Sequence, residues 1–299
     1  MKVAVSVGDL NGIGIEIALK AHNKIKRLID PIYCINQTML SKAANKLNLK
    51  IPADFNIFDV KGEFEINPGQ IDPNSGRYSF DSFITAINLA NTQKADAITT
   101  LPINKEAWNK AGINYKGHTE VLRDIFKKDA IMMLGCDKLY TALFTEHIPL
   151  KEVPSNIKKE SLIRFMLDFY ASTKFDKIGV LGLNPHAGDG GVLGDEEINE
   201  ISPAIRQANQ ILKKEIFYGP LVPDIAFTRK KGVFIAMYHD QGLAPLKALY
   251  FDESINVSLN LPILRTSVDH GTAFDIAYKG LADTKSYENA IKYILNHLS

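Results

Sequence analysis

The chain begins with Lys2-Val-Ala-Val-Ser-Val7, followed at once by Gly8-Asp-Leu-Asn-Gly-Ile-Gly14. A nearly unbroken apolar run of this kind is typical of a strand buried on both faces of a sheet. The glycine-rich stretch after it is expected to open a helix, where a dinucleotide-binding loop would stand. That fingerprint needs a further glycine at position 17, which is Ile17. The opening therefore predicts a strand–turn–helix unit without a standard dinucleotide loop.

Similar apolar runs recur along the chain, separated by segments whose apolar residues follow a helical period. Ser75, Ser155 and Ser286 are expected to cap three of these helices. Gly219–Pro223 is expected to be a turn, and a candidate crossover between domains. The alternation predicts an α/β protein with a largely parallel sheet. The expected strands are Lys2–Val7, Pro31–Asn36, Asn56–Val60, Ala95–Thr100, Ala130–Leu134, Tyr140–Thr145, Lys177–Leu183, Gly232–Tyr238 and Ile255–Leu261.

Composition narrows the class of protein. A length of 299 residues favours two domains. The 35 Lys and Arg against 34 Asp and Glu argue against nucleic acid or an anionic membrane as the main partner. No apolar run reaches the roughly 18 residues that span a bilayer, and no secretory leader is expected. The two cysteines, Cys34 and Cys136, are far apart, so we expect no disulfide and a reducing cytoplasm.

Three of the seven histidines share one context. His147, His186 and His239 each come just after a predicted strand. In a parallel sheet the three would emerge at the carboxyl ends of strands, where ligand sites of open α/β sheets lie. Three neutral imidazoles with an open position would make a catalytic type of divalent metal site. Their separations match no local metal signature, so three unrelated loop histidines remain the alternative at this point.

Two glycine-rich segments are candidates for binding anions. Gly188-Asp-Gly-Gly-Val-Leu-Gly194 follows a predicted strand and suits close approach of backbone N–H groups to a phosphate or cofactor. A flexible turn that caps a helix is the alternative. Gly112–Thr119 resembles a phosphate-binding loop with His118 in place of lysine, but it follows a predicted helix, which excludes triphosphate binding. Gly117-His-Thr-Glu120 remains a reasonable anion-binding helix start.

The last third of the chain adds two cations in apolar surroundings. Lys247 stands in Ala-Pro-Leu-Lys-Ala-Leu and Arg265 in Leu-Pro-Ile-Leu-Arg-Thr. A cation in such a setting needs an anionic partner more often than a solvated one does, so both are candidates for ligand binding. Internal salt bridges are the alternative for each.

These motifs together resemble the 4-hydroxythreonine-4-phosphate dehydrogenases of vitamin B6 biosynthesis. The matching stretches follow the family's order over most of the chain. Two departures are Leu10-Asn11, where the family usually has Pro-Ala, and Glu146, where a second threonine is more usual. The stretch between Pro223 and Val233 is also shorter. The matching stretches are Pro102–Lys105, Gly117–Glu120, Thr145–Leu150, Asn184–Gly188, Tyr238–Gly242 and Arg265–Ala273.

The resemblance implies a two-domain α/β/α fold like the isocitrate and isopropylmalate dehydrogenases. The first domain is expected to comprise 1–115 plus 272–299, and the second 116–271, with much of the dimer interface. A homodimer with its active site at the subunit interface is implied, as are metal ligands drawn from both subunits. The implied ligands are His147, His186 and His239, and the implied substrate contacts are His118, Thr119, Lys247, Asn256 and Arg265.

The activity implied is oxidation of 4-phosphooxy-L-threonine by NAD or NADP with one divalent metal, zinc, cobalt or magnesium. The resulting β-keto acid would lose carbon dioxide to give 3-amino-2-oxopropyl phosphate. Asp269 or His270 is a candidate for proton transfer or for support of the metal ligands. Gly188, Gly190 and Gly191 are candidates for cofactor binding. The alternatives are a dehydrogenase of the same family acting on another phosphorylated hydroxy acid, and a histidine–metal hydrolase.

Overall fold

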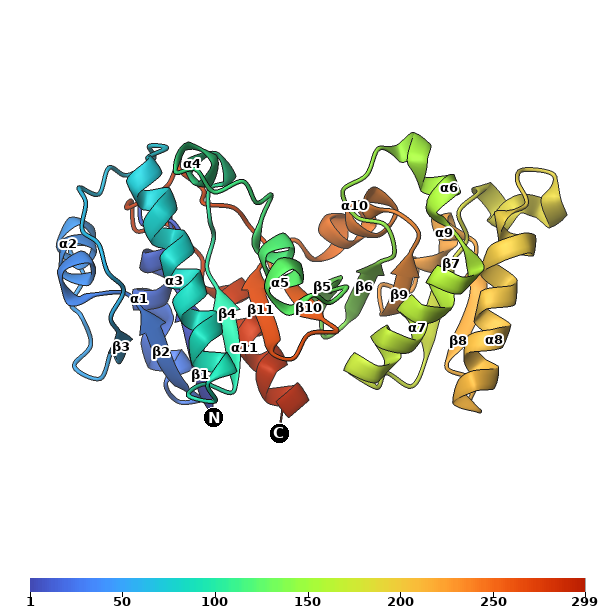
Figure 1. Cartoon of the computed structure of the whole chain (residues 1–299), viewed down its shortest axis with the longest axis horizontal. Coiled ribbons are helices and arrows are strands. Elements are labelled where there is room, and N and C mark those ends of the chain that lie inside the picture. Colours follow the sequence, from blue (N-terminus) through green and yellow to red (C-terminus); the bar gives the residue numbers. More distant parts are fainter. Residues whose placement is uncertain (299) are drawn as a thin grey trace. The chain divides into compact units, whose positions relative to one another are not determined.

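The structure is a computed structural model that describes residues 1–298 (Figure 1). The chain divides into two compact units. Unit 1 comprises Met1–Lys128, Ile255–Val257 and Leu261–Ser299, and unit 2 comprises Asp129–Ser254 and Ser258–Asn260. Among the described residues, no helix is both long and apolar enough to cross a membrane.

Unit 1 is built on parallel strands in the order β3-β2-β1-β4-β11. Val3, Ala4 and Val5 of β1 are fully buried, as expected for a strand with helices on both faces. Figure 1 shows α3 and α11 on opposite faces of these strands. The strands are β1 (Lys2–Ser6), β2 (Asp30–Cys34), β3 (Ile57–Phe58), β4 (Ala97–Thr100) and β11 (Leu264–Val268), and the helices are α1 (Gly14–Ile25), α2 (Gln37–Leu47), α3 (Pro73–Asn91), α4 (Lys105–Lys110), α5 (His118–Phe126) and α11 (Lys285–Leu298).

Unit 2 has strands in the order β5-β6-β9-β7-β8, of which only the β5–β6 pair is antiparallel. The helices α7 and α8 pack against each other, and α10 packs against β5, β6 and β9. The strands are β5 (Ile131–Cys136), β6 (Leu139–Leu143), β7 (Ile178–Leu181), β8 (Phe217–Leu221) and β9 (Gly232–Ala236), and the helices are α6 (Val153–Asn156), α7 (Lys159–Thr173), α8 (Ser202–Leu212), α9 (Pro223–Ala226) and α10 (His239–Tyr250). A further strand, β10 (Ile255–Leu259), has residues in each unit.

The α/β class and the nine predicted strands are confirmed, but two strands were not predicted. β8 contains the Gly219-Pro220 pair that we expected in a turn, and it lies at the edge of its sheet, where proline is tolerated. β11 carries the polar run Arg265-Thr266-Ser267, so it lacks the apolar pattern of a buried strand. These polar side chains are buried because each finds a hydrogen-bond partner on the neighbouring strand β4.

The helix starts differ from the predicted caps. The side chain of Asp72, not Ser75, accepts the N-terminal hydrogen bond of α3, at 2.7 Å from Asn74 N. The segment expected to begin at Ser155 is two helices, and α7 starts only after Lys158. Ser286 lies inside the first turn of α11, where its hydroxyl accepts from Asp269 N at 3.2 Å. This serine next to a helix start thus makes a tertiary contact rather than a cap.

The units also differ from the domain limits expected from the sequence. Unit 1 continues to Lys128 rather than ending at 115, because α5 packs Val121 and Leu122 into its core. It resumes at Leu261 rather than at 272, because β11 pairs with β4. As a result His118, Thr119 and Arg265 belong to unit 1 and not, as expected, to the second domain.

Candidate active site

The three candidate metal ligands all lie in unit 2, directly after parallel strands. His147 follows β6, His186 follows β7, and His239 is the first residue of α10 after β9. The rings of His147 and His239 have centroids 5.5 Å apart. Strand pairing explains this closeness, because β6 and β9 are neighbours in register and their carboxyl ends meet.

The pair suits a divalent ion. Two imidazoles that share a tetrahedral zinc ion, with Zn–N bonds of about 2.0–2.1 Å, have ring centroids about 5 Å apart. The Nδ1 of His239 bonds to the carboxylate of Asp240 at 2.7 Å, a contact that leaves Nε2 to bind a metal. His186 does not join them: within residues 1–298 no cluster of three or more His, Cys, Asp or Glu is placed to hold a metal ion. One chain thus brings two of the three predicted ligands together.

His186 lies in a left-handed turn, Pro185–Gly191, that also contains the predicted cofactor glycines. His186, Ala187 and Asp189 all have positive φ, at 54°, 53° and 45°. A left-handed conformation costs a residue with a side chain roughly 1–2 kcal/mol, so this turn must be held by its surroundings. Gly188 is buried within it, whereas Gly190 is exposed, and a side-chain carbon added to Gly190 would have no neighbour within 4 Å.

Lys247, the further predicted substrate contact in unit 2, lies on α10. Its ammonium is 5.6 Å from the ring centre of Phe251. A cation over an aromatic face gains electrostatic stabilisation from the ring.

The candidate phosphate-binding residues of unit 1 lie around Arg265. This arginine is only 2% exposed, and burial lowers its pKa to about 9. Its Nε and Nη2 donate to the hydroxyl of Thr100 at 3.1 and 2.6 Å, and Nη1 donates to Asn256 Oδ1 at 3.3 Å. Register places Thr100 near the arginine, since β11 pairs with β4. The hydrogen bond to Asn256 places this residue directly beside Arg265.

His118 is the first residue of α5 and is buried beside the same cluster. Its ring meets Phe83 edge-on with centroids 4.6 Å apart and Trp108 with centroids 5.6 Å apart. Burial, with added repulsion from Arg265 and Lys105, holds the pKa of His118 well below its usual range. The ring is therefore neutral, and its Nε2 has no hydrogen-bond partner among the described residues. Thr119, next on the helix, is also buried.

Asp269 and His270 follow the carboxyl end of β11 in unit 1. The Nδ1 of His270 contacts Gly271 O at 3.1 Å. Nearby in sequence, Thr272 O accepts from Ile13 N at 3.1 Å and so ties this segment to the glycine-rich turn after β1. That turn needs Gly8, whose φ is +70° and whose added side-chain carbon would lie 2.2 Å from Pro102 O.

Four residues near these groups were given no role from the sequence, although Lys105 and Gln241 lie inside matching stretches: Thr100, Lys105, Glu197 and Gln241. The hydroxyl of Thr100 accepts from Arg265, and nothing in the local sequence marks this last residue of β4 as the partner of a residue so far along the chain. Glu197 and Gln241 are buried polar residues that bond to the chain near the histidines. Gln241 lies inside the recognised Tyr238–Gly242 motif, and its position two residues after His239 is a signal that could have found it.

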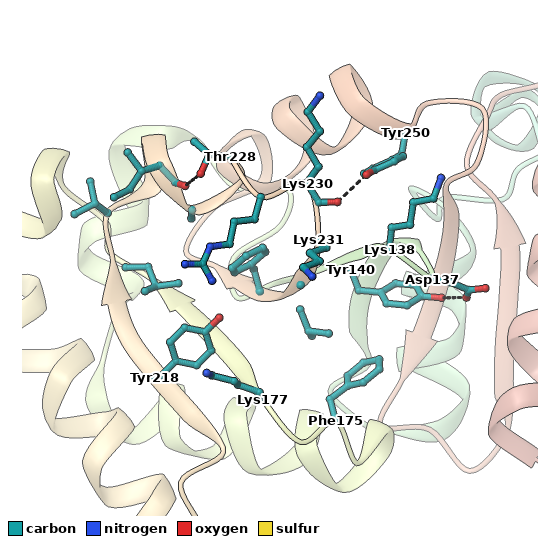
Figure 2. A pocket seen from close by; sticks show the side chains of 18 residues that line it. Asp137, Lys138, Tyr140, Phe175, Lys177, Tyr218, Thr228, Lys230, Lys231 and Tyr250 are labelled. Carbon is teal, nitrogen blue, oxygen red and sulfur yellow. Dashed lines mark hydrogen bonds between the residues drawn. The ribbon is translucent and has the colours of Figure 1, made fainter.

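A pocket of unit 2 lies at the amino ends of β6 and β9, opposite the ends that the predicted ligands follow. This pocket of about 1040 Å³ is bordered by the starts of β6 and β9 (Figure 2). Lys138 lies over the ring of Tyr250 and Lys177 over that of Tyr218, each 5.1 Å from the centroid. Because the predicted ligands follow the carboxyl ends, this pocket is separate from them, and none of the predicted site residues lines it.

Comparison with known proteins identifies relatives over nearly the whole chain. Residues 18–294 match the family described as "Pyridoxal phosphate biosynthetic protein PdxA". A 4-hydroxythreonine-4-phosphate dehydrogenase of Sulfurimonas denitrificans is 63% identical over 296 residues, covering 98% of this chain and 96% of the relative. The relative of the same name from Campylobacter fetus is 57% identical and covers 98% and 97% of the two chains.

Solved structures agree with the fold. The crystal structure of a 4-hydroxythreonine-4-phosphate dehydrogenase from Klebsiella pneumoniae has a TM-score of 0.80 and 32% identity, covering 100% of this chain and 99% of that one. A β-decarboxylating dehydrogenase from Thermococcus kodakarensis is similar in fold alone, with a TM-score of 0.54, 13% identity and coverage of 99% and 83%. The expected resemblance to the decarboxylating dehydrogenases is thus confirmed at the level of the fold.

Proposed function

The chain belongs to the PdxA family of pyridoxal phosphate biosynthetic proteins, and on that premise we propose that it oxidises 4-phosphooxy-L-threonine with NAD or NADP. The product, 2-amino-3-oxo-4-phosphooxybutyrate, decarboxylates to 3-amino-2-oxopropyl phosphate. The observation that carries this proposal is 63% identity, across 98% of the chain, to a dehydrogenase of that name. In this proposal the residues around Arg265 bind the phosphate of the substrate, and the three histidines hold the metal ion at its reactive end.

The phosphate end of the substrate is assigned to Arg265, His118, Thr119 and Asn256, with Lys247 as a further cation. A buried guanidinium with a lowered pKa gains most from an anionic ligand, because the ligand offsets its lost hydration. Charge-assisted hydrogen bonds of this type contribute about 1.5–3 kcal/mol each. The neutral His118 adds a hydrogen bond from a ring whose Nε2 has no protein partner among residues 1–298.

The reactive end of the substrate is assigned to the histidines. His147 and His239, with rings 5.5 Å apart, together with His186, would hold a divalent zinc, cobalt or magnesium ion. When bound, such an ion lowers the pKa of a coordinated hydroxyl and favours its oxidation. Asp240 supports this role by accepting from His239 Nδ1, which orients the ring. NAD or NADP would supply the hydride acceptor, and Gly188, Gly190 and Gly191 are proposed to contact it.

Asp269 and His270 are proposed to assist proton transfer or to support the metal ligands. We further propose a cytoplasmic homodimer with an active site at the subunit interface, since the third ligand is not brought to the other two among residues 1–298 of one chain. This arrangement needs neither nucleic acid nor a membrane as partner.

The deciding experiment measures formation of reduced nicotinamide with 4-phosphooxy-L-threonine, before and after chelation and after readdition of zinc or cobalt. We expect turnover that chelation abolishes and metal restores, and a strong preference over the unphosphorylated amino acid. Four-carbon sugar-acid phosphates assayed in parallel test the alternative substrates. Phosphate release without nicotinamide would instead support a hydrolase, and full activity after complete metal removal would exclude the metal role.

A further inference from the structure

A network of hydrogen bonds in unit 2 joins the three strand ends that carry the histidines. After β6, Thr145 donates from its hydroxyl to Met237 O at 2.6 Å, and Met237 directly follows β9. Met237 N in turn donates to the side-chain oxygen of Gln241 at 2.7 Å. The amide nitrogen of Gln241 then donates to Gly182 O, just after β7, at 2.7 Å. One buried glutamine therefore connects the chain before His239 to the chain before His186.

Glu197 binds Leu183 and Asn184, the residues between Gly182 and Pro185-His186. Glu197 is 3% exposed, and one oxygen of its carboxylate accepts from Leu183 N and Asn184 N, each at 2.7 Å. Its other oxygen accepts from the side-chain nitrogen of Asn184 at 2.9 Å. All three donors belong to the two residues that lead into Pro185-His186. The carboxylate lies at the start of a π-helical turn, Glu197–Ile201, a feature that is frequent at functional sites.

The glycines around Glu197 indicate how closely the left-handed turn is fitted to it. A side-chain carbon on Gly182 would lie 3.0 Å from one carboxylate oxygen, and a carbon on Gly188 would lie 2.9 Å from the other. The turn and the carboxylate are thus in direct contact. The positive φ values of His186, Ala187 and Asp189 are costly by themselves, and Glu197 accepts three of the bonds that fix the entrance to this turn.

We propose that Glu197 and Gln241 are positioning residues for the metal site, with Glu197 fixing the direction in which His186 is presented. The inference rests on the proposed function, because it assumes that His186 is a metal ligand. Neither residue is expected to touch the metal. Loss of a group that orients a metal ligand typically lowers metal affinity about 10- to 100-fold.

The test uses the full chain and cobalt(II), whose visible absorption reports the number and geometry of nitrogen ligands. Glu197→Gln keeps the shape but places an NH2 group against the NH2 of Asn184, so one bond is lost. We expect its cobalt dissociation constant to rise roughly 10- to 100-fold, with a changed spectrum and a folded metal-free protein by circular dichroism. Gln241→Leu should act in the same direction. Glu160→Gln, on the exposed start of α7, is the matched control and should leave cobalt binding unchanged.

Asn184→Ala provides a second, milder variant if Glu197→Gln fails to fold, because it removes only the side-chain bonds that Asn184 donates to Glu196 at 2.7 Å and to Glu197 at 2.9 Å. A purely structural role predicts lower stability with an unchanged cobalt constant and spectrum in the folded fraction, which would overturn the proposal. Two other results would count against the proposed function itself. The wild-type protein would bind no cobalt, or the His186→Ala variant would bind cobalt as tightly as the wild type.

Discussion

At the residue scale, Arg265 is the side chain on which phosphate recognition depends. Arg265→Met keeps much of the buried volume and removes the charge. We expect KM for the phosphorylated substrate to rise by roughly 10- to 100-fold, since a charge-assisted bond contributes about 1.5–3 kcal/mol, while the slow reaction of the unphosphorylated analogue changes little. Steady-state kinetics on both substrates measures this difference.

Arg27→Met, at an exposed position of unit 1, is the control for the loss of one positive charge. Equal losses on the phosphorylated and unphosphorylated substrates would contradict the phosphate role of Arg265 and indicate a general disturbance of unit 1.

Asp9 gives a prediction about pH at the same scale. Burial raises its pKa from 3.8 to about 6, against hydrogen bonds from Ser75 and Asn11 that lower it. The folded protein therefore favours the protonated carboxyl, and the free energy of unfolding falls as pH rises between about 4 and 6. At about 1.4 kcal/mol for each factor of ten in the ionisation constant, the free energy of unfolding should fall by roughly 3 kcal/mol in total over this range.

Asp9→Asn should remove this dependence. We expect the variant to be more stable than the wild type above pH 6, by up to roughly 3 kcal/mol, and nearly equal to it at pH 4. Urea unfolding followed across this range tests the sign, and Asp59→Asn at an exposed position is the control. A variant that is less stable at every pH would mean that the fold needs the ionised carboxylate.

At the scale of elements, the left-handed turn makes different demands on neighbouring glycines. Gly188 has a φ of +82° and is packed on Glu197 and Gly194, whereas Gly190 has a φ of +66° and open space around it. Gly190→Ala should lower the free energy of unfolding by only about 1–2 kcal/mol, from its backbone conformation. Gly188→Ala should cost roughly 2–4 kcal/mol, because the methyl group also displaces Glu197.

Thermal or urea unfolding of the two variants measures this contrast, and cobalt affinity should weaken only for Gly188→Ala. Equal effects at the two positions would mean that the turn is not fitted to Glu197. A raised KM for NAD with Gly190→Ala, at little cost in stability, would support the predicted contact of this loop with the cofactor.

Sequence periodicity located the elements whose burial depends on apolar side chains alone. Most of the nine predicted strands are near-continuous apolar runs, as in Val3–Val7. β11 was not predicted because its burial depends on hydrogen bonds to a distant strand, such as that of Ser267 to Thr100 O at 3.0 Å, and no local sequence pattern reveals these bonds. For the same reason the role of Glu197 was not predicted, since its partners Leu183 and Asn184 lie 14 and 13 residues away in the sequence. The three histidines could be proposed together as ligands because each follows a predicted strand.

At the scale of the whole molecule, the placement of the histidines predicts that two chains supply one metal site. One chain brings His147 and His239 together, and no third ligand joins them among residues 1–298. The family resemblance implies ligands from two subunits. The protein should therefore behave as a dimer in light scattering, and variants that lack different ligands should be able to complement one another.

Mixing inactive variants in pairs should restore a defined fraction of the wild-type activity. His147→Ala, His186→Ala and His239→Ala are each expected to be inactive, and they are unfolded and refolded together in pairs. If two ligands come from one subunit and the third from its partner, two variants that lack ligands contributed by different subunits form a mixed dimer with one intact site and one doubly damaged site. Random pairing makes half of the dimers mixed, so about a quarter of wild-type activity should return. Two of the three pairs should complement, and the pair whose histidines come from the same chain should not. Recovery in none of the pairs, with mixed dimers confirmed by mass, would mean that each chain builds its site alone.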